Sequence, residues 1–313
     1  MKKFLAKSFL FAIITIIGFQ FIGTFFNLAS KKNGEEKINW ILSKKDQKYD
    51  FAFLGNSRVL TMVDVNYLQN SWGELKGINL GSTGSSFAEN YATLYEFYKN
   101  KNNIDNLFLQ IDEKSLDPQK GFIRSFQEQL FFNFMGDAEI DKIYIDQSGN
   151  NKFLLWKYAP FTRYAEFNEP YKNYALSMFL HKKIDYDSTF GSQITGEINS
   201  QQKLPKRVIK NWQVSEIGVK YFEKIIKLAE EHNTNIILYT APYYKKHNNE
   251  QPINSIEKYI QNIALKNSFT FLNFRRSKVS EDTQYFNDEE HLNKVGTALF
   301  MTEFAPEAER TLR

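Results

Sequence analysis

The most extended pattern in the chain is an apolar run near its N-terminus. No charged residue occurs from Ser8 to Leu28, while Lys2, Lys3 and Lys7 precede the run. A helix needs about 20 apolar residues to cross a bilayer, which this run provides. A signal peptide has a shorter apolar region, and Leu28-Ala29-Ser30 is a poor cleavage site. The pattern therefore favours an uncleaved transmembrane anchor over a cleaved signal peptide.

The apolar run also suggests how the chain is divided. We expect residues 1–30 to form a cytoplasmic tip and a membrane anchor, and the largely polar residues 31–48 to form a linker or short stalk helix. Residues 49–313 are then one folded domain. Lysines stand on both sides of the run, so charge alone does not set its orientation. If the chemistry is extracytoplasmic, the N-terminus faces the cytoplasm.

Beyond residue 48, short apolar runs alternate with helical patterns. Strands are expected at 49–54, 77–80, 106–111, 235–240 and 269–274. Helices are expected at 63–69, from Ser85 or Ser86 to Tyr98, and at 215–232, 253–266 and 294–304. Alternation of this kind predicts an α/β fold with three layers, in which helices cover both faces of a central parallel sheet.

The alternation stops between about residues 114 and 210, after the third expected strand. This stretch is rich in aromatic residues, many of them between Phe122 and Phe167. We interpret it as a mostly helical insertion. Because ligands of open α/β sheets bind at the carboxyl ends of the strands, the insertion is placed to form a lid or substrate platform. The alternative is that its aromatic residues make only a small core of their own.

Composition excludes several classes of function. The net charge of +4 is spread along the chain without a basic stripe, so nucleic acid is not an expected partner. The absence of cysteine excludes disulfides and zinc held by thiolates, and the histidines show no metal-ligand spacing. Gly81-x-x-Gly84 lacks the Gly-Lys-Ser/Thr of a phosphate-binding loop. Neither a metal nor an organic cofactor is expected.

Two short motifs carry the candidate chemistry. Gly55-Asn56-Ser57-Arg58 follows the first expected strand, and Asp288-x-x-His291 stands just before the last expected helix. A hydroxyl is a weak nucleophile until a base removes its proton, and histidine is the usual base. A carboxylate bonded to the other imidazole nitrogen orients that base. The joint placement of the motifs predicts a triad of Ser57, His291 and Asp288.

With these motifs the chain resembles the SGNH (GDSL-like) hydrolases. Gly55-Asn56-Ser57 is similar to the family's Gly-Asp-Ser block, and Asn79-Leu80-Gly81 is similar to its second block. The resemblance implies that the N–H groups of Ser57 and Gly81 bind the oxyanion. It covers roughly residues 49–112 and 235–304, and is nearest to membrane-anchored bacterial members similar to accessory factors of cell-surface polysaccharide O-acylation.

The chain departs from the family at the third block. Where that block has Gly-x-Asn-Asp, this chain has Gln110-Ile111-Asp112-Glu113. An ionised Asp112 would repel the developing oxyanion, so it is turned away, protonated or replaced by another donor, or the activity is low. Arg58 is a candidate either for binding an anionic substrate or for pairing with a nearby carboxylate.

The motifs predict a serine esterase or O-acyltransferase, and the resemblance implies that it acts on acyl esters of a cell-surface carbohydrate, with acetyl the favoured acyl group. The resemblance implies a membrane-bound O-acyltransferase as a partner and the inner membrane as the location. The alternative is a non-catalytic SGNH-fold accessory or glycan-binding subunit of a polysaccharide modification or export complex.

Overall fold

The computed structural model divides the chain into two compact units. It describes residues 1–33, 36–73, 75–117, 126–167, 169, 170, 172, 173, 176, 180, 183–194, 196, 213–245 and 250–312. The helical unit comprises Met1–Asn39 and Gln127–Ile184, and the sheet unit comprises Trp40–Phe126 and Asp185–Arg313.

The sheet unit is built on a five-stranded parallel sheet with the strand order β2-β1-β3-β4-β5. Its strands are β1 (Lys48–Leu54), β2 (Gly77–Asn79), β3 (Asn103–Gln110), β4 (Asn235–Thr240) and β5 (Thr270–Asn273). All four pairings are parallel, with Phe53 opposite both Asn79 and Phe108. The predicted α/β fold with a central parallel sheet is confirmed, although β3 begins three residues earlier than expected.

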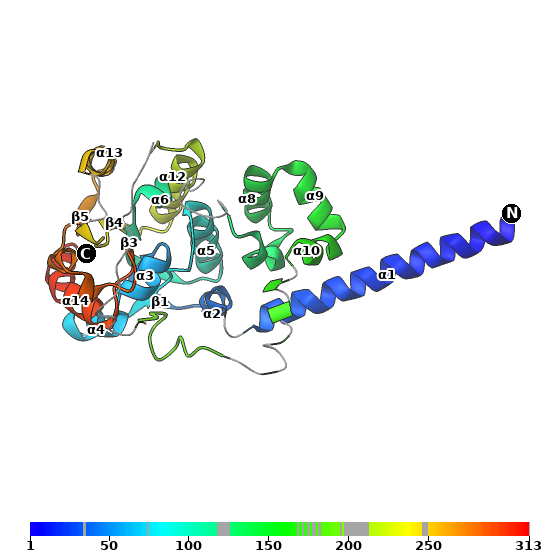
Figure 1. Cartoon of the computed structure of the whole chain (residues 1–313), viewed down its shortest axis with the longest axis horizontal. Helices are drawn as coiled ribbons and strands as arrows, with labels where there is room; N and C mark the ends of the chain where they lie inside the picture. Colours follow the sequence, from blue (N-terminus) through cyan, green and yellow to red (C-terminus); the bar gives the residue numbers. More distant parts are fainter. Residues whose placement is uncertain are drawn as a thin grey trace. The chain divides into compact units, whose positions relative to one another are not determined.

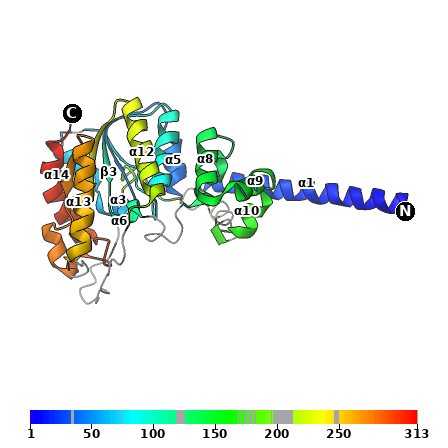
Figure 2. The same ribbon diagram turned by 90° about the horizontal axis from the view of Figure 1, so that it is seen from above.

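Helices cover both faces of this sheet, as the nearly continuous apolar strands require. Figures 1 and 2 show one group of helices on one face and a second group on the other. The first group is α5 (Phe87–Lys99), α12 (Glu216–Glu231) and α13 (Glu250–Lys266). The second is α3 (Ser57–Met62), α4 (Val65–Ser71) and α14 (Lys294–Glu309).

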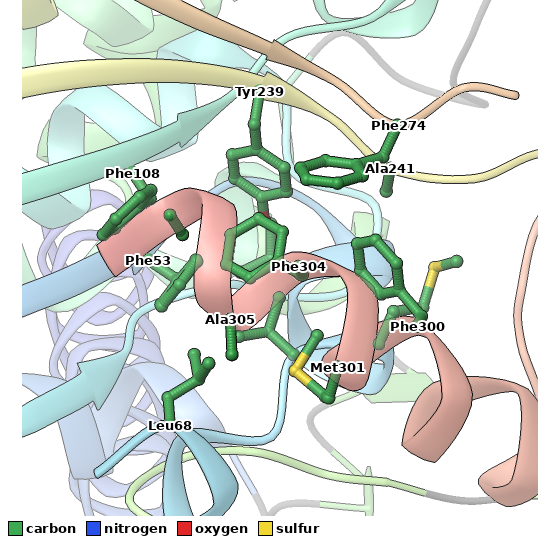
Figure 3. Packing of buried hydrophobic residues seen from close by; sticks show 14 of the residues in the cluster. Phe53, Leu68, Phe108, Tyr239, Ala241, Phe274, Phe300, Met301, Phe304 and Ala305 are labelled. Atoms are coloured by element: carbon green, nitrogen blue, oxygen red, sulfur yellow. The ribbon is translucent and has the colours of Figure 1, made fainter. Parts of the chain in front are cut away.

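The core between the sheet and α14 is dominated by aromatic side chains. Phe53 and Phe108 stack at 4.7 Å, and Phe304 of α14 packs on both of them and on Tyr239 (Figure 3). These rings are completely buried. They fix the last turns of the chain against the ends of β1, β3 and β4, and so bring the C-terminal region to the strand that precedes Ser57.

The segment after β1 differs from the sequence prediction of a single helix at 63–69. Two short helices form instead, because two side chains act as caps. Asn56 accepts a hydrogen bond from the Arg58 N–H and starts α3, and Asp64 accepts one from the Tyr67 N–H and starts α4. The predicted helix beginning at Ser85 or Ser86 starts at Phe87, with Ser86 and Glu89 forming a capping box.

The other elements that the structure describes in the sheet unit are short. They are α6 (Glu113–Leu116), η4 (Lys278–Glu281) and η5 (Thr283–Tyr285). Helix α2 (Lys37–Ser43) lies within the predicted linker of residues 31–48, which is thus partly helical.

The helical unit contains the N-terminal helix and the described part of the insertion. Its elements are α1 (Lys2–Lys32), η1 (Glu128–Leu130), η2 (Phe132–Phe134), α8 (Ala138–Ser148), α9 (Asn150–Tyr158) and α10 (Phe161–Glu166). Phe132, Tyr144, Trp156 and Phe167 are buried and pack as one ring cluster. These aromatic residues therefore form a core of the insertion's own, whereas Phe122 lies outside the described residues.

Helix α1 is long and apolar enough to cross a membrane, and within the described residues it is alone in this. Most of its side chains before Gly23 are exposed, and Gly23, Ala29 and Ser30 are buried. The helix continues four residues beyond the apolar run that the sequence shows.

Candidate active site

Ser57 is the first residue of α3 and follows the carboxyl end of β1. The chain must turn sharply between strand and helix at Gly55. A Cβ atom on Gly55 would lie 2.5 Å from a methyl carbon of Val59 and 2.6 Å from Oε1 of Gln110. Only glycine fits so close to these side chains. The local sequence therefore sets Ser57 at the sheet edge where α/β proteins bind ligands.

His291 lies within hydrogen-bonding distance of this serine. Ser57 Oγ and His291 Nε2 are 2.8 Å apart although 234 positions separate them in the chain. On the other side of the ring, His291 Nδ1 is 2.9 Å from Oδ1 and 2.8 Å from Oδ2 of Asp288. The structure thus brings together all three residues of the predicted triad, in the order hydroxyl, imidazole and carboxylate.

Asp288 is held in its ionised form. Partial burial raises the pKa of its carboxyl, but the hydrogen bond and charge of His291 and the backbone N–H groups of Glu290 and His291 outweigh this and lower the pKa to about 2. Both N–H groups donate to Oδ1 at 2.8 Å. An ionised Asp288 favours the imidazole tautomer with its proton on Nδ1, which leaves Nε2 free to accept the proton of Ser57.

The loop carrying His291 is closed by local contacts. Phe286 and Leu292 form an antiparallel bridge, and the Asn287 N–H donates to the His291 carbonyl at 2.8 Å. Asn293 caps α14 through the Gly296 N–H. These contacts fix the histidine backbone next to the start of α14, so the base is positioned by its own segment of chain.

Asp112 does not face the serine as an oxyanion donor would. Its carboxylate is fully buried, and Oδ1 accepts from the backbone N–H groups of Lys114 and Ser115, each at 3.0 Å, which caps α6. Oδ2 accepts from Arg58 Nη1 at 3.1 Å and from Gln110 Nε2 at 2.8 Å. The sequence left several possibilities for Asp112, and the structure agrees with the one in which its carboxylate is turned away from the serine.

Arg58 pairs with that carboxylate and is only 1% exposed. Its Nη2 donates to the carbonyls of Ala241 at 2.6 Å and Pro242 at 2.7 Å. The guanidinium also stacks on the Tyr243 ring, 3.6 Å from its centroid. Arg58 is therefore occupied by an adjacent carboxylate and two carbonyls, and its buried position does not suit it to bind a substrate.

A second buried arginine, Arg275, lies on the same tyrosine ring as Arg58. Arg275 Nη2 donates to Glu113 Oε2 at 2.5 Å, and its guanidinium lies 4.7 Å from the Tyr243 ring. We call Arg58, Asp112, Tyr243, Arg275 and Glu113 the buried charge layer. The sequence analysis singled out only the first two. Their positions in the sequence could have revealed Tyr243 and Arg275, because these residues closely follow β4 and β5 and so reach the same sheet edge.

Gly81 lies in the loop after β2 against α3. A Cβ there would be 2.6 Å from Val59 Cβ, so glycine is needed for packing. Its N–H donates to Asn79 Oδ1 at 2.9 Å and already has an acceptor. Among the described residues, no hydrogen bond is formed by the Ser57 N–H. Of the two expected oxyanion donors, only that of Ser57 is unengaged.

In the part of the chain that the structure describes, no three His, Cys, Asp or Glu side chains are grouped as a metal site would require.

The comparisons with known proteins give similarities to solved structures at low sequence identity. No protein-family model matches the chain, and neither does any curated protein sequence. Among solved structures, a protein described as an acylhydrolase from Bacteroides fragilis is 14% identical, with 86% of this chain and 88% of that chain covered and a TM-score of 0.39. A GDSL-like lipase from Bacteroides thetaiotaomicron is 12% identical, covers 85% and 90%, and has a TM-score of 0.39. The chain is thus similar to an acylhydrolase and a GDSL-like lipase structure.

Proposed function

We propose that this protein is a serine esterase or O-acyltransferase that acts on acyl esters, acetyl esters first among them, of a cell-surface carbohydrate. The observation that carries the proposal is the 2.8 Å contact between Ser57 Oγ and His291 Nε2, with Asp288 on the other imidazole nitrogen. A binding module has no need of this arrangement, whereas an acyl-transfer enzyme requires it.

The proposed reaction runs in two halves. His291 Nε2 takes the Ser57 proton as Oγ attacks the acyl carbonyl, and the resulting imidazolium is stabilised by Asp288. His291 then returns the proton to the departing sugar oxygen, which leaves the acyl group on Ser57. In the second half, water or a sugar hydroxyl attacks this acyl-enzyme. Attack by water gives hydrolysis and attack by a hydroxyl gives transfer.

The oxyanion formed in each half needs hydrogen-bond donors. The Ser57 N–H is unengaged, whereas the Gly81 N–H must leave Asn79 Oδ1 before it can contribute. Losing one such donor costs about 10²–10³ in rate in a comparable site. We therefore expect slow turnover of simple esters, with a faster rate when the natural substrate draws Gly81 into place.

A second candidate function is a non-catalytic accessory or glycan-binding subunit of a polysaccharide modification complex. The engaged Gly81 N–H and the inward-turned Asp112 favour it, because neither supplies a donor to an oxyanion. The hydrogen-bonded arrangement of Ser57, His291 and Asp288 favours the enzyme instead.

A serine-reactive fluorophosphonate separates these candidates. The full chain in detergent is treated with the probe and, separately, with p-nitrophenyl acetate. Labelling and turnover are expected for the natural chain and for Ser71→Ala, which changes an exposed serine at the end of α4. Both signals should vanish in Ser57→Ala and His291→Ala. A folded natural chain that neither reacts nor turns over would support the accessory function.

The proposal includes location and partner. Helix α1 would hold the protein in the inner membrane with its sheet unit outside the cytoplasm, beside a membrane-bound O-acyltransferase that supplies acyl groups. Because the chain has no cysteine, single substitutions give clean labels. In intact cells, a membrane-impermeant maleimide should label Lys227→Cys and leave Lys3→Cys unlabelled until lysis. The reverse pattern would overturn this orientation.

A further inference from the structure

The insertion contacts helix α1 within its apolar run, and not only at its C-terminal end. Phe19 stacks on Phe161 of α10, with ring centroids 4.7 Å apart, and α10 lies beside α1 in both views (Figures 1 and 2). Nearer the end of the helix, Asn133 donates to Ser30 Oγ at 3.2 Å. The insertion therefore follows α1 from its last turn back to Phe19.

Phe19 lies well inside the apolar run. Between Phe19 and Leu28 a helix rises about 14 Å, which is close to half of the roughly 30 Å hydrocarbon core. If the whole run from Ser8 to Leu28 were surrounded by lipid, α10 would lie near the bilayer centre. A span from Phe4 to Phe21, with Lys7 close enough to its first turn to reach the headgroups, has 18 residues. It puts α10 at the outer boundary of the bilayer. After Phe21 the helix has buried residues at Gly23, Ala29 and Ser30, while Ile22, Phe25 and Leu28 are exposed.

The neighbouring helix α9 presents an apolar surface to solvent. Leu154 is 40% exposed, Leu155 51% and Tyr158 72%. Phe153 and Trp156 of the same helix are buried, so its inward face is already satisfied. Exposed apolar side chains that cluster on one helix face mark an interaction surface.

The charges on α9 do not point to a charged partner. Lys152 is paired with Glu166 at 2.6 Å and Lys157 with Asp141 at 2.6 Å. Their ammonium nitrogens also lie over aromatic rings, 4.6 Å from the Trp156 centroid and 5.2 Å from the Phe153 centroid, so both charges are engaged within the helical unit. An interfacial helix buries such an apolar face at the boundary between headgroups and acyl chains, where tyrosine is favoured.

We propose that α9 and the start of α10 rest in the outer leaflet of the lipid bilayer, with Leu154, Leu155 and Tyr158 inserted among the upper acyl chains. The insertion then acts as a second, interfacial membrane contact continuous with α1. This inference rests on the proposed membrane location of α1. The contact is apolar, so it does not require anionic lipid.

Depth-dependent quenching tests the proposal on the full chain in phosphatidylcholine vesicles. An environment-sensitive fluorophore is attached to Leu155→Cys or Tyr158→Cys, and nitroxides are placed on the lipid near the headgroup or deep in the acyl chain. Ile14→Cys is the control for the span and Lys227→Cys for the aqueous phase. At positions 155 and 158 we expect the shallow nitroxide to quench about twofold or more, the deep one less, and no change on adding anionic lipid.

Each outcome is decisive. Quenching at position 14 without quenching at 155 and 158 would overturn the interfacial contact and leave the anchor intact. An unquenched position 14 would overturn the membrane location itself. Quenching at 155 and 158 only when anionic lipid is present would overturn the apolar basis of the contact. Circular dichroism of each labelled variant checks that the chain keeps its overall helix content.

Discussion

Two polar clusters meet at the carboxyl edge of the same sheet and differ in their exposure to water. The side chains of His291 and Asp288 are 26% and 46% exposed, whereas those of Arg58 and Asp112 are 1% and 0% exposed. Ser57 and Arg58 are adjacent in the chain, yet one belongs to the open cluster and the other to the buried charge layer.

The turn after β1 therefore contributes to two clusters, Ser57 to the exposed one and Arg58 to the buried one. The open cluster, Ser57, His291 and Asp288, contains short hydrogen bonds, and its side chains are partly exposed to water. The buried charge layer binds loops from several strands and fixes the turn that carries Ser57. A buried pair is costly to break because the remaining charge stays desolvated. Changes in the open cluster should therefore alter rate, and changes in the buried layer should alter stability.

The largest expected effect is on catalysis by Asp288→Asn. The amide keeps the shape of the side chain but removes the charge and favours the wrong imidazole tautomer, so kcat should fall by up to about 10⁴-fold. The Tm should fall only slightly, because water screens the charge of a side chain that is 46% exposed. Steady-state kinetics with p-nitrophenyl acetate and a thermal melt measure the two quantities. A large loss of Tm would contradict the proposal that the open cluster affects rate and the buried charge layer affects stability.

The buried pair gives the next largest effect. Arg58→Met leaves Asp112 without its cation and should lower the free energy of unfolding by about 3–5 kcal/mol. Arg276→Met, which removes an exposed arginine paired with Glu257 at 3.1 Å, should cost about 1 kcal/mol or less. Urea denaturation followed by circular dichroism measures both.

A double variant sharpens this test. Asp112→Asn keeps an oxygen to cap α6 and removes the charge, so adding it to Arg58→Met should recover part of the lost stability. No recovery would mean that Arg58 acts through packing on Tyr243 and not through its charge.

Gly81→Ala should have a smaller effect that touches both clusters. Its methyl group would lie 2.6 Å from Val59 Cβ and 2.9 Å from the Leu60 backbone nitrogen. Displacement of α3 should cost about 1–3 kcal/mol and move Ser57 away from His291. Gly18→Ala, with nothing within 4 Å, is the matched control. Unchanged stability and turnover in Gly81→Ala would show that α3 tolerates the shift.

The smallest expected effect is the pH dependence due to Asp288. Because its pKa is lowered from 3.8 to about 2, the carboxylate contributes stability above about pH 4 and loses it as the pH falls toward 2. The stability difference between the natural chain and Asp288→Asn should thus be constant above pH 5 and shrink below pH 4. Urea midpoints at pH 6, 4 and 3 test this, and a difference that grows on acidification would contradict it.

The sequence predicted the sheet, the covering helices and the three residues of the open cluster because each is marked locally. Apolar runs mark the strands, and the three-residue spacing of Asp288 and His291 marks their contact. The buried charge layer was harder to predict because no short motif marks its pairs, such as Glu113 with Arg275. Residue types alone did not show whether Arg58 faces substrate or Asp112. Burial decides that, and burial depends on the packing of all five strands.

The self-contained loop around His291 has a consequence for the order in which the site is assembled. Its bridge and hydrogen bonds join residues close in sequence and cost little loop-closure entropy, whereas the Ser57–His291 contact must close a loop of 234 positions. We expect the loop to form early and the contact late. Reactivity toward the fluorophosphonate should then appear only in the last refolding phase, after the far-ultraviolet signal has recovered. Reactivity that appears earlier would contradict this order. Reactivity of Ser57 thus measures when the turn after β1 and the loop around His291 come into contact.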